Sequence, residues 1–130
     1  MAEKNILVVD DDRDLTNSLK AYFEARGYGI RVAHSGVEGM KAIQEAHPDL
    51  ILLDIMMDTD ADGFNLAYTL KAKDDCKRIP IIIMSGFMDH LNDKSKSFEF
   101  VMGNDWPAVE EIKKPASLAR IHEAVDRVLA

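Results

Sequence analysis

Three aspartates follow or interrupt two short apolar segments, and their positions suggest a cation site. Asp10 and Asp11 come directly after Ile6–Val9, and Asp54 lies within the apolar run 50–55. If these acids meet, each carboxylate pair at about 4 Å repels by roughly 4 kcal/mol at an effective dielectric constant near 20. A divalent cation with oxygen ligands offsets that repulsion, and few carboxylates with open positions suit Mg²⁺. Taken alone, Asp54 is explained better as the cap of a turn.

A hydroxyl and an ammonium group follow two later apolar segments. Ser85 follows Ile79–Met84, and Lys114 follows Val109–Lys113. The ends of parallel strands that point in one direction lie at one edge of a sheet, and open α/β folds bind ligands there. If all these segments are parallel strands, their carboxylates, hydroxyl and ammonium converge on one cleft.

The elements that position these groups alternate regularly along the chain. Apolar residues at helical spacing follow each apolar segment, and capping residues mark several boundaries: Asp12 and Ser117 as N-caps, a capping box at 35–38, and Gly27 as a helix stop. Strands are predicted at 6–9, 28–33, 50–55, 79–84 and 109–113, and helices at 13–26, 35–46, 63–73, 89–102 and 118–129. Such alternation predicts an α/β fold with a parallel sheet covered on both faces by right-handed crossovers.

Composition narrows the class of protein. A length of 130 residues predicts a single domain, residues 1–130, and the net charge of −7 argues against a nucleic-acid surface. No apolar run approaches membrane-spanning length, and the N-terminus lacks a signal-peptide core, so we expect a soluble cytoplasmic protein. Cys76 is the lone cysteine, which we interpret as an inert loop thiol. His34, His47, His90 and His122 lack the spacing of metal ligands and are predicted to be surface residues.

The pattern as a whole resembles the receiver domain of two-component response regulators. The motifs that carry the resemblance are ILVVDDD at 6–12, DLILLDIMM at 49–57 followed by DG at 62–63, IPIIIMSG at 79–86 and KP at 114–115. They occur in the family's order and span essentially the whole chain. The resemblance implies a flavodoxin-like, doubly wound sheet of five parallel strands in the order 2-1-3-4-5.

The same resemblance implies roles for the acids. Asp54 would be the phosphoacceptor, taking a phosphoryl group from a phosphohistidine of a sensor kinase or a phosphotransfer protein. Asp11 would bind Mg²⁺ directly and Asp10 through water, with Asp54 and the backbone carbonyl of Met56 completing the protein's share of the ligands.

Two further residues would act on the transferred group. Lys114 would neutralise charge on the phosphoryl oxygens, and Ser85 would move to hydrogen-bond the new phosphoryl group. That movement would shift an existing inactive–active equilibrium and control docking to a partner protein. The chain would then be a stand-alone regulator. It would not be an enzyme, apart from catalysing its own phosphotransfer and its own slow autodephosphorylation. The slow rate is suggested by the apolar residues Met56 and Phe87.

Three departures from the family pattern concern the loops. The acidic segment 58–62 matches the opening of a calcium-binding loop, although Thr69 stands where the last ligand belongs, so an acidic rim beside the Mg²⁺ site is the preferred interpretation. Ser85 and Lys114 are 29 positions apart, more than is common in the family, and the excess falls around 103–107. Glu111 stands three residues before Lys114, where the family usually has an aromatic residue. Phe100 and Trp106 make this region our candidate output surface.

Two alternative functions stay open. One is an aspartate-nucleophile phosphatase, since Ile6–Asp12 also reads as a strand followed by Asp-x-Asp, but Asp54 would then have no role. The other is a pseudo-receiver that binds partners without phosphorylation. The sequence names neither the kinase nor the target, and it leaves open whether phosphorylation drives dimerisation.

Overall fold

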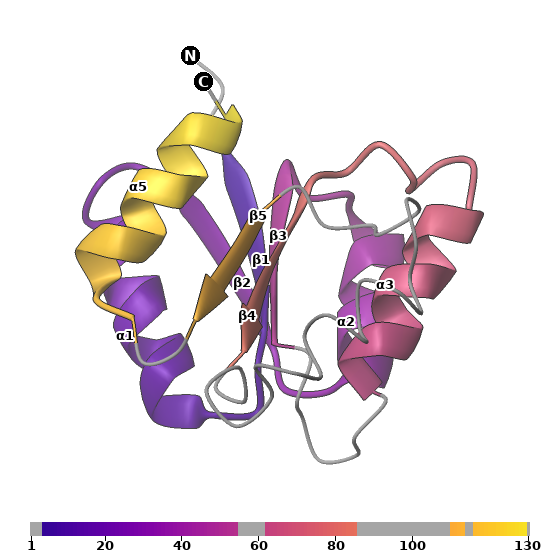
Figure 1. The fold of residues 1–130 in the computed structure, drawn as a ribbon, viewed down its shortest axis with the longest axis horizontal. Coiled ribbons are helices and arrows are strands. Elements are labelled where there is room, and N and C mark those ends of the chain that lie inside the picture. The colour runs from indigo at the N-terminus through magenta and orange to yellow at the C-terminus, as the bar shows by residue number, and fades with distance from the viewer. Residues whose placement is uncertain (1–3, 55–61, 86–109, 114–115, 130) are drawn as a thin grey trace.

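A computed structural model describes residues 4–54, 62–85, 110–113 and 116–129, which form a parallel sheet with helices on both faces (Figure 1). The sheet has 5 strands in the order β2-β1-β3-β4-β5, and every neighbouring pair is parallel. The strands are β1 (Asn5–Val9), β2 (Gly29–Ala33), β3 (Leu50–Asp54), β4 (Ile81–Ser85) and β5 (Glu110–Lys113). The predicted fold class and strand order are therefore confirmed.

The helices lie in two layers. Helices α1 (Arg13–Glu24) and α5 (Leu118–Leu129) cover one face of the sheet, and α2 (Gly36–Glu45) and α3 (Asp62–Ala72) cover the other (Figure 1). Their bounds lie within one or two residues of the predicted ones. The predicted helix 89–102 falls outside the described residues. Among the described helices, none is long and apolar enough to span a lipid bilayer.

Strand β4 begins two residues later than expected, at Ile81 instead of Ile79. The reason is Pro80, which has no N–H to donate to the ladder. Its carbonyl does take part, because it accepts a 3.0 Å hydrogen bond from the backbone N–H of Ile51. The apolar run thus predicts the strand, and the proline sets where regular pairing starts.

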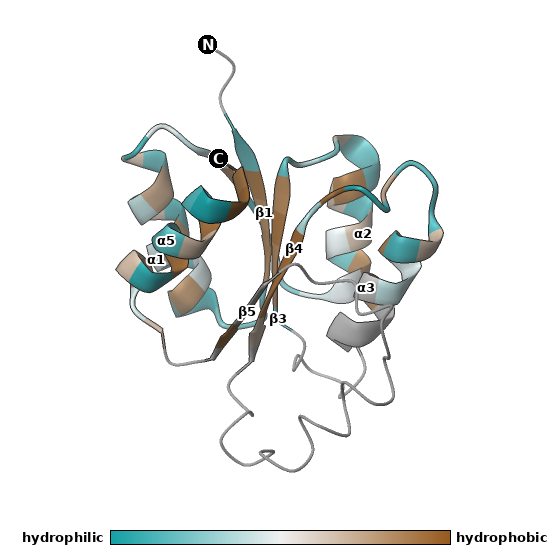
Figure 2. Cartoon of the chain, turned by 45° about the horizontal axis from the view of Figure 1, so that its top comes forward, coloured by the Kyte–Doolittle hydropathy of each residue, from teal (hydrophilic) through white to brown (hydrophobic). Residues whose placement is uncertain are grey.

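Alternate residues of the strands lie on opposite faces of the sheet and pack in two separate cores. Leu50 and Leu52 pack with α1 and α5, whereas Ile51 and Leu53 pack with α2 and α3, and all four are 0% exposed. The strands are correspondingly the most hydrophobic part of the described chain (Figure 2). Because side chains alternate along a strand, Asp54 continues the phase of Leu50 and Leu52.

Polar caps set the ends of the helices. The Asp12 carboxylate accepts the N–H of Leu15 at 3.1 Å, so its predicted role as the N-cap of α1 is confirmed. Ser35 caps α2 through the N–H of Glu38 at 3.1 Å. The return bond of the predicted capping box differs, since the Glu38 carboxylate accepts the N–H of His34 instead of that of Ser35. Gly27 has φ 89°, the left-handed conformation expected at a helix stop.

Helix α2 lies very close to the sheet. A Cβ atom at Gly39 would stand 3.1 Å from a methyl group of Val9 and 3.1 Å from one of Leu66. The glycine therefore lets α2 contact β1 and α3 at the same point, and few side-chain atoms separate the three elements.

Candidate functional site

The carboxyl ends of the central strands carry a cluster of three aspartates. One ligand oxygen from each of Asp10, Asp11 and Asp54 lies within 4.8 Å of the others. Asp10 is 0% and Asp54 3% exposed, whereas Asp11 is the more accessible. The structure thus brings together the three acids that the sequence places after β1 and at the end of β3.

Strand pairing explains why these acids meet. Strands β1 and β3 are adjacent and parallel, with Val9 opposite Leu53, so the next residues of the two strands are Asp10 and Asp54. The N–H of Asp10 also donates to the carbonyl of Ala33 at 3.0 Å, which continues the pairing with β2. The backbone of Asp10 is therefore fixed on the sheet edge.

Hydrogen bonding orients the Asp10 carboxylate. Its Oδ1 accepts the N–H of Asp12 at 2.9 Å, a bond across two residues that turns the chain toward α1. Asp12 itself is held as the α1 cap, so the acidic segment is braced between the sheet and the helix. These contacts fix the Asp10 carboxylate before any ligand binds.

The electrostatics of the cluster favour a divalent cation. At 4.8 Å, two carboxylates repel by roughly 3.5 kcal/mol at an effective dielectric constant near 20. The donors are all carboxylate oxygens, which are the hard ligands that Mg²⁺ prefers, and the exposed side of Asp11 leaves room for water ligands. The residues present therefore fit Mg²⁺.

The remaining predicted site residues are described only in part. Ser85 ends β4 and its backbone pairs with that of Lys113, but its hydroxyl lies outside the described side chains. Met56 and Lys114 lie outside the described residues, as do Phe87, Phe100 and Trp106. The backbone of Glu111 pairs with Ile83 in the sheet.

A second group of possible metal ligands was missed by the sequence reasoning. One ligand atom from each of His47, Asp75 and Cys76 lies within 4.8 Å of the others. These residues precede β3 and β4, so a search for polar residues before strands, in addition to those after strands, would have found them. Spacing along the chain gave no signal, because 27 residues separate His47 from the next member.

Cys76, predicted to be an inert loop thiol, is more deeply buried than a loop position suggests. It lies in the turn before β4 as expected, and it is 3% exposed and belongs to the core between the sheet and α2 and α3. Burial, followed by the nearby Asp75 carboxylate, raises the pKa of this thiol. A raised pKa lowers the thiolate fraction at neutral pH.

The prediction of surface histidines holds only in part for His122. Its side chain is 25% exposed and packs edge-to-face against Tyr22, Phe23 and Tyr28, at centroid distances of 5.4–6.1 Å. Its Nδ1 lies 3.0 Å from the Tyr22 hydroxyl. His34 is half-buried with Nε2 3.3 Å from the Thr16 hydroxyl, and His90 lies outside the described residues.

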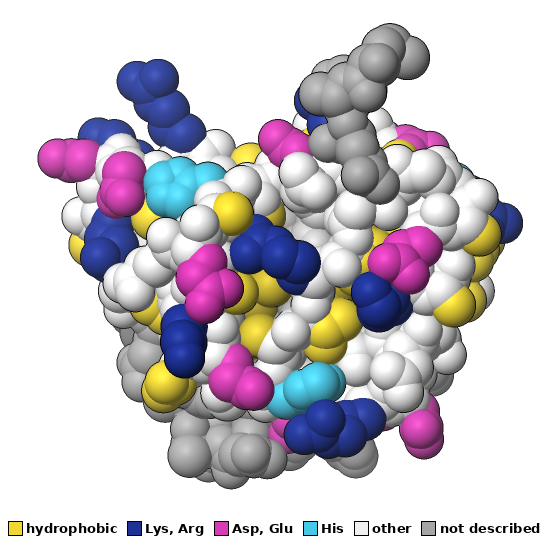
Figure 3. Space-filling view, turned by 180° about the vertical axis from the view of Figure 1, so that it is seen from behind, with side chains coloured by type: hydrophobic (Ala, Val, Ile, Leu, Met, Phe, Trp, Pro, Cys, Tyr) yellow, Lys and Arg dark blue, Asp and Glu magenta, His cyan; other side chains and the backbone are white. Residues whose placement is uncertain are grey.

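Charges are mixed over the surface. On the face shown in Figure 3, basic and acidic side chains are interspersed and form no large basic patch among the described residues.

Solved structures share this fold. The receiver domain of a signal transduction histidine kinase from Syntrophus aciditrophicus superposes with a TM-score of 0.81 at 28% identity, covering 97% of this chain and 89% of that one. A CheY-like response regulator receiver domain protein from Methanospirillum hungatei JF-1 gives a TM-score of 0.80 at 26% identity, with coverage of 98% and 94%.

Sequence relatives give the same answer. The response regulator MprA of Mycobacterium avium (strain 104) is 33% identical over 116 residues, 89% of this chain and 46% of the relative. The chain thus spans about half the length of the curated relatives it matches. The family model of the response regulator receiver domain matches residues 6–126. With both the acid cluster and the strand order in place, the chain belongs to the response regulator receiver domain family.

Proposed function

We propose that this receiver domain accepts a phosphoryl group on Asp54 from a phosphohistidine of a sensor kinase or a phosphotransfer protein. The observation that carries the proposal is the convergence of Asp10, Asp11 and Asp54 within 4.8 Å at the carboxyl edge of the sheet. The modification would control reversible docking to a downstream protein.

The positions of the acids distinguish their roles. Asp10 is held as a hydrogen-bond acceptor by the N–H of Asp12, which suits a fixed carboxylate that binds a cation through water. Asp11, the most accessible of the three, suits a direct cation ligand. Asp54 ends the central strand β3, between the acid pair after β1 and the end of β4, where an incoming phosphoryl group would meet all these groups.

The transfer is a nucleophilic displacement at phosphorus. A carboxylate oxygen of Asp54 forms the new P–O bond as the P–N bond to the donor imidazole breaks, and the departing ring nitrogen keeps the electron pair and takes a proton. Bound Mg²⁺ would supply charge neutralisation on the phosphoryl oxygens. Lys114 would add a second positive charge, and the hydroxyl of Ser85 would donate a hydrogen bond to the new aspartyl phosphate.

The proposal is tested by incubating the protein with Mg²⁺ and acetyl phosphate and measuring its intact mass. We expect a single phosphate adduct that is lost in Asp54→Asn and on addition of EDTA. Asp12→Asn is the matched control, because asparagine still caps α1 and leaves the cluster intact. An adduct that persists in Asp54→Asn contradicts the assignment. Absence of any adduct favours a phosphorylation-independent interaction module.

A further inference from the structure

We propose that His47, Asp75 and Cys76 form a transition-metal site, best matched to Zn²⁺, at the amino edge of the sheet. The Nε2 atom of His47 lies 3.6 Å from Oδ2 of Asp75 and 3.9 Å from Sγ of Cys76. One ligand atom from each of the three side chains lies within 4.8 Å of the others. Three different donor atoms therefore lie close together.

These distances are close to those of a tetrahedral zinc centre. With Zn–N near 2.0 Å, Zn–S near 2.3 Å and tetrahedral angles, the N···O separation is about 3.3 Å and the N···S separation about 3.5 Å. The corresponding separations here are 3.6 Å and 3.9 Å. Closure by a few tenths of an ångström, within the freedom of side-chain torsions, brings the N···O and N···S separations to these values, and the O···S separation starts from within 4.8 Å.

The donor set separates this group from the acid cluster at the opposite edge. A thiolate, an imidazole and a carboxylate select Zn²⁺ or Co²⁺, whereas an all-carboxylate set selects Mg²⁺. Three protein ligands leave one tetrahedral position for water. The thiol proton passes to solvent as the metal–sulfur bond forms.

The turn that carries Cys76 is well ordered by its own hydrogen bonds. The N–H of Cys76 donates to the carbonyl of Lys73 at 3.1 Å, and the Cys76 carbonyl accepts the N–H of Ile79 at 3.0 Å. The side chain is 3% exposed and packs in the core. The sulfur is therefore held in place at the base of the group.

The segment that carries His47 is anchored on both sides. On one side, the guanidinium of Arg31 donates to the carbonyls of Ala42 and Ala46 at the end of α2. On the other, Asp49 exchanges two 2.8 Å hydrogen bonds with the backbone of Asn5. His47 stands between these anchors, so only its side chain has to adjust.

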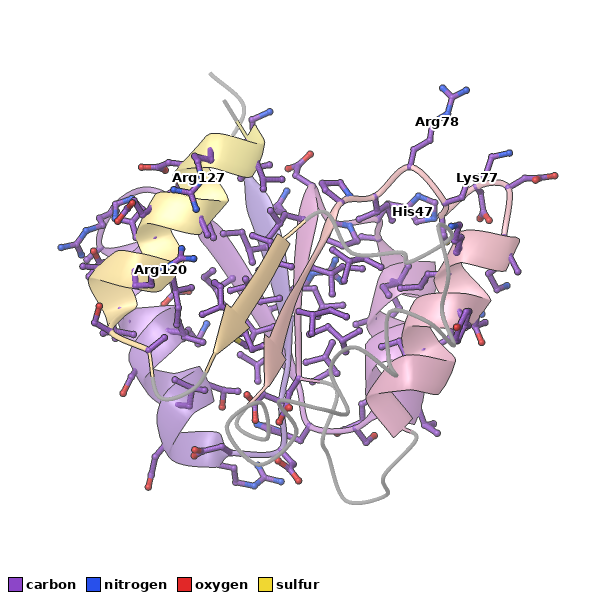
Figure 4. The ribbon with its side chains drawn as sticks, viewed as in Figure 1. His47, Lys77, Arg78, Arg120 and Arg127 are labelled. Atoms are coloured by element: carbon purple, nitrogen blue, oxygen red, sulfur yellow. The ribbon has the colours of Figure 1, made fainter. Side chains whose placement is uncertain are left out.

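An ion can reach the group from solvent. The side chains of His47 and Asp75 are 43% and 70% exposed, whereas Cys76 is buried. Figure 4 shows His47 near Lys77 at the end of the molecule away from the carboxyl ends of the strands, with Arg78 pointing outward. A bound metal would tie the α2–β3 connection to the α3–β4 connection.

The test uses Co²⁺ as a spectroscopic probe on the whole chain, with excess Mg²⁺ present to occupy the acid cluster. A thiolate-to-cobalt charge-transfer band at one equivalent reports ligation by Cys76, the lone cysteine. We expect the band to disappear in Cys76→Ser. Loss of a residue that only hydrogen-bonds to a metal ligand typically costs about 10–100-fold in metal affinity. Because His47→Gln and Asp75→Asn alter proposed ligands themselves, each should weaken binding by more than about tenfold.

Asp74→Asn is the matched control. Asp74 is adjacent to Asp75, its side chain is 98% exposed, and it pairs with Lys77 at 3.5 Å outside the ligand group. This variant and Asp54→Asn should both retain the band, which keeps the result independent of the proposed phosphorylation site. His47→Gln and Asp75→Asn change exposed positions, so they test the site even if Cys76→Ser perturbs the core.

A thermal shift provides the second readout. Zn²⁺ should raise the melting temperature of the wild type and of Asp74→Asn, but not of His47→Gln or Asp75→Asn. The proposal is overturned if no charge-transfer band forms. It is equally overturned if the band keeps its strength in His47→Gln and Asp75→Asn, since the metal would then be bound by an isolated thiolate.

Discussion

The hydroxyl of Tyr28 donates a 2.6 Å hydrogen bond to Oδ1 of Asp126, 98 residues further along the chain. The other oxygen of the same carboxylate lies 3.3 Å from Nε2 of His122. Asp126 thus joins the segment before β2 to the aromatic group around His122. It links α5, the last helix, to the start of strand β2.

This hydrogen bond predicts a loss of stability at alkaline pH. Hydrogen bonding to Asp126, followed by burial, raises the pKa of Tyr28 to about 12. Because the folded-state value lies above the usual 10, the bond contributes fully below pH 10 and is lost as the pH rises toward 12. The free energy of unfolding, measured with urea, should fall more steeply over this range in wild type than in Tyr28→Phe. Identical slopes for wild type and Tyr28→Phe would contradict the argument.

Removing the cap of α1 should lower the free energy of unfolding of the domain. Asp12→Ala deletes the acceptor of the Leu15 N–H and should lower the free energy of unfolding by about 1 kcal/mol. Asp12→Asn keeps a capping oxygen and should lose only a small part of this. Asp14→Ala serves as a control, because it removes an acid from the same first turn without removing the cap. Equal losses at both positions would point to the helix dipole instead of the cap.

The acid cluster should reduce stability in the absence of a cation. In EDTA, Asp54→Asn should raise the free energy of unfolding by about 1 kcal/mol, a screened share of the pairwise carboxylate repulsion. Mg²⁺ should then stabilise the wild type more than the variant, because the variant has lost one anionic ligand. Melting temperatures in EDTA and in Mg²⁺ measure both effects. A variant that is less stable than the wild type in EDTA would show that the contacts of Asp54 outweigh the repulsion.

The buried thiol predicts slow chemical modification in metal-free protein. Cys76 is 3% exposed and its pKa is raised, so alkylation by iodoacetamide at neutral pH should be at least about tenfold slower than in urea-unfolded protein. Because a raised pKa leaves less thiolate, the rate on folded protein should increase with pH above the usual thiol range. Mass spectrometry at timed intervals follows the reaction. Equal rates in native and unfolded protein would refute the buried position.

The sequence predicts β1, β3 and β4 well because these strands are short apolar runs that end in or directly before a polar residue. Strand β5, with Glu110, Glu111 and Lys113, gives a weaker signal. Periodicity cannot supply the strand order, which came from the family resemblance and which the structure confirms. The acid cluster was predictable because parallel strands bring Asp10 and Asp54 to one edge. His122 was predicted only in part, for a physical reason. Its partners Tyr22 and Tyr28 are about a hundred residues away in the sequence, and only tertiary packing makes an exposed-looking helix position part of an aromatic group.

The close contact at Gly39 has a mechanical consequence. Since a single methyl group at this position would already press on Val9 and Leu66, α2 has no clearance to roll or slide across the sheet. Helix α2, strand β1 and helix α3 therefore form a tightly packed half of the domain whose elements cannot easily shift against one another. We therefore expect a rearrangement that follows a change at Asp54 to occur on the other side of β3, where β4 and the edge strand β5 lie.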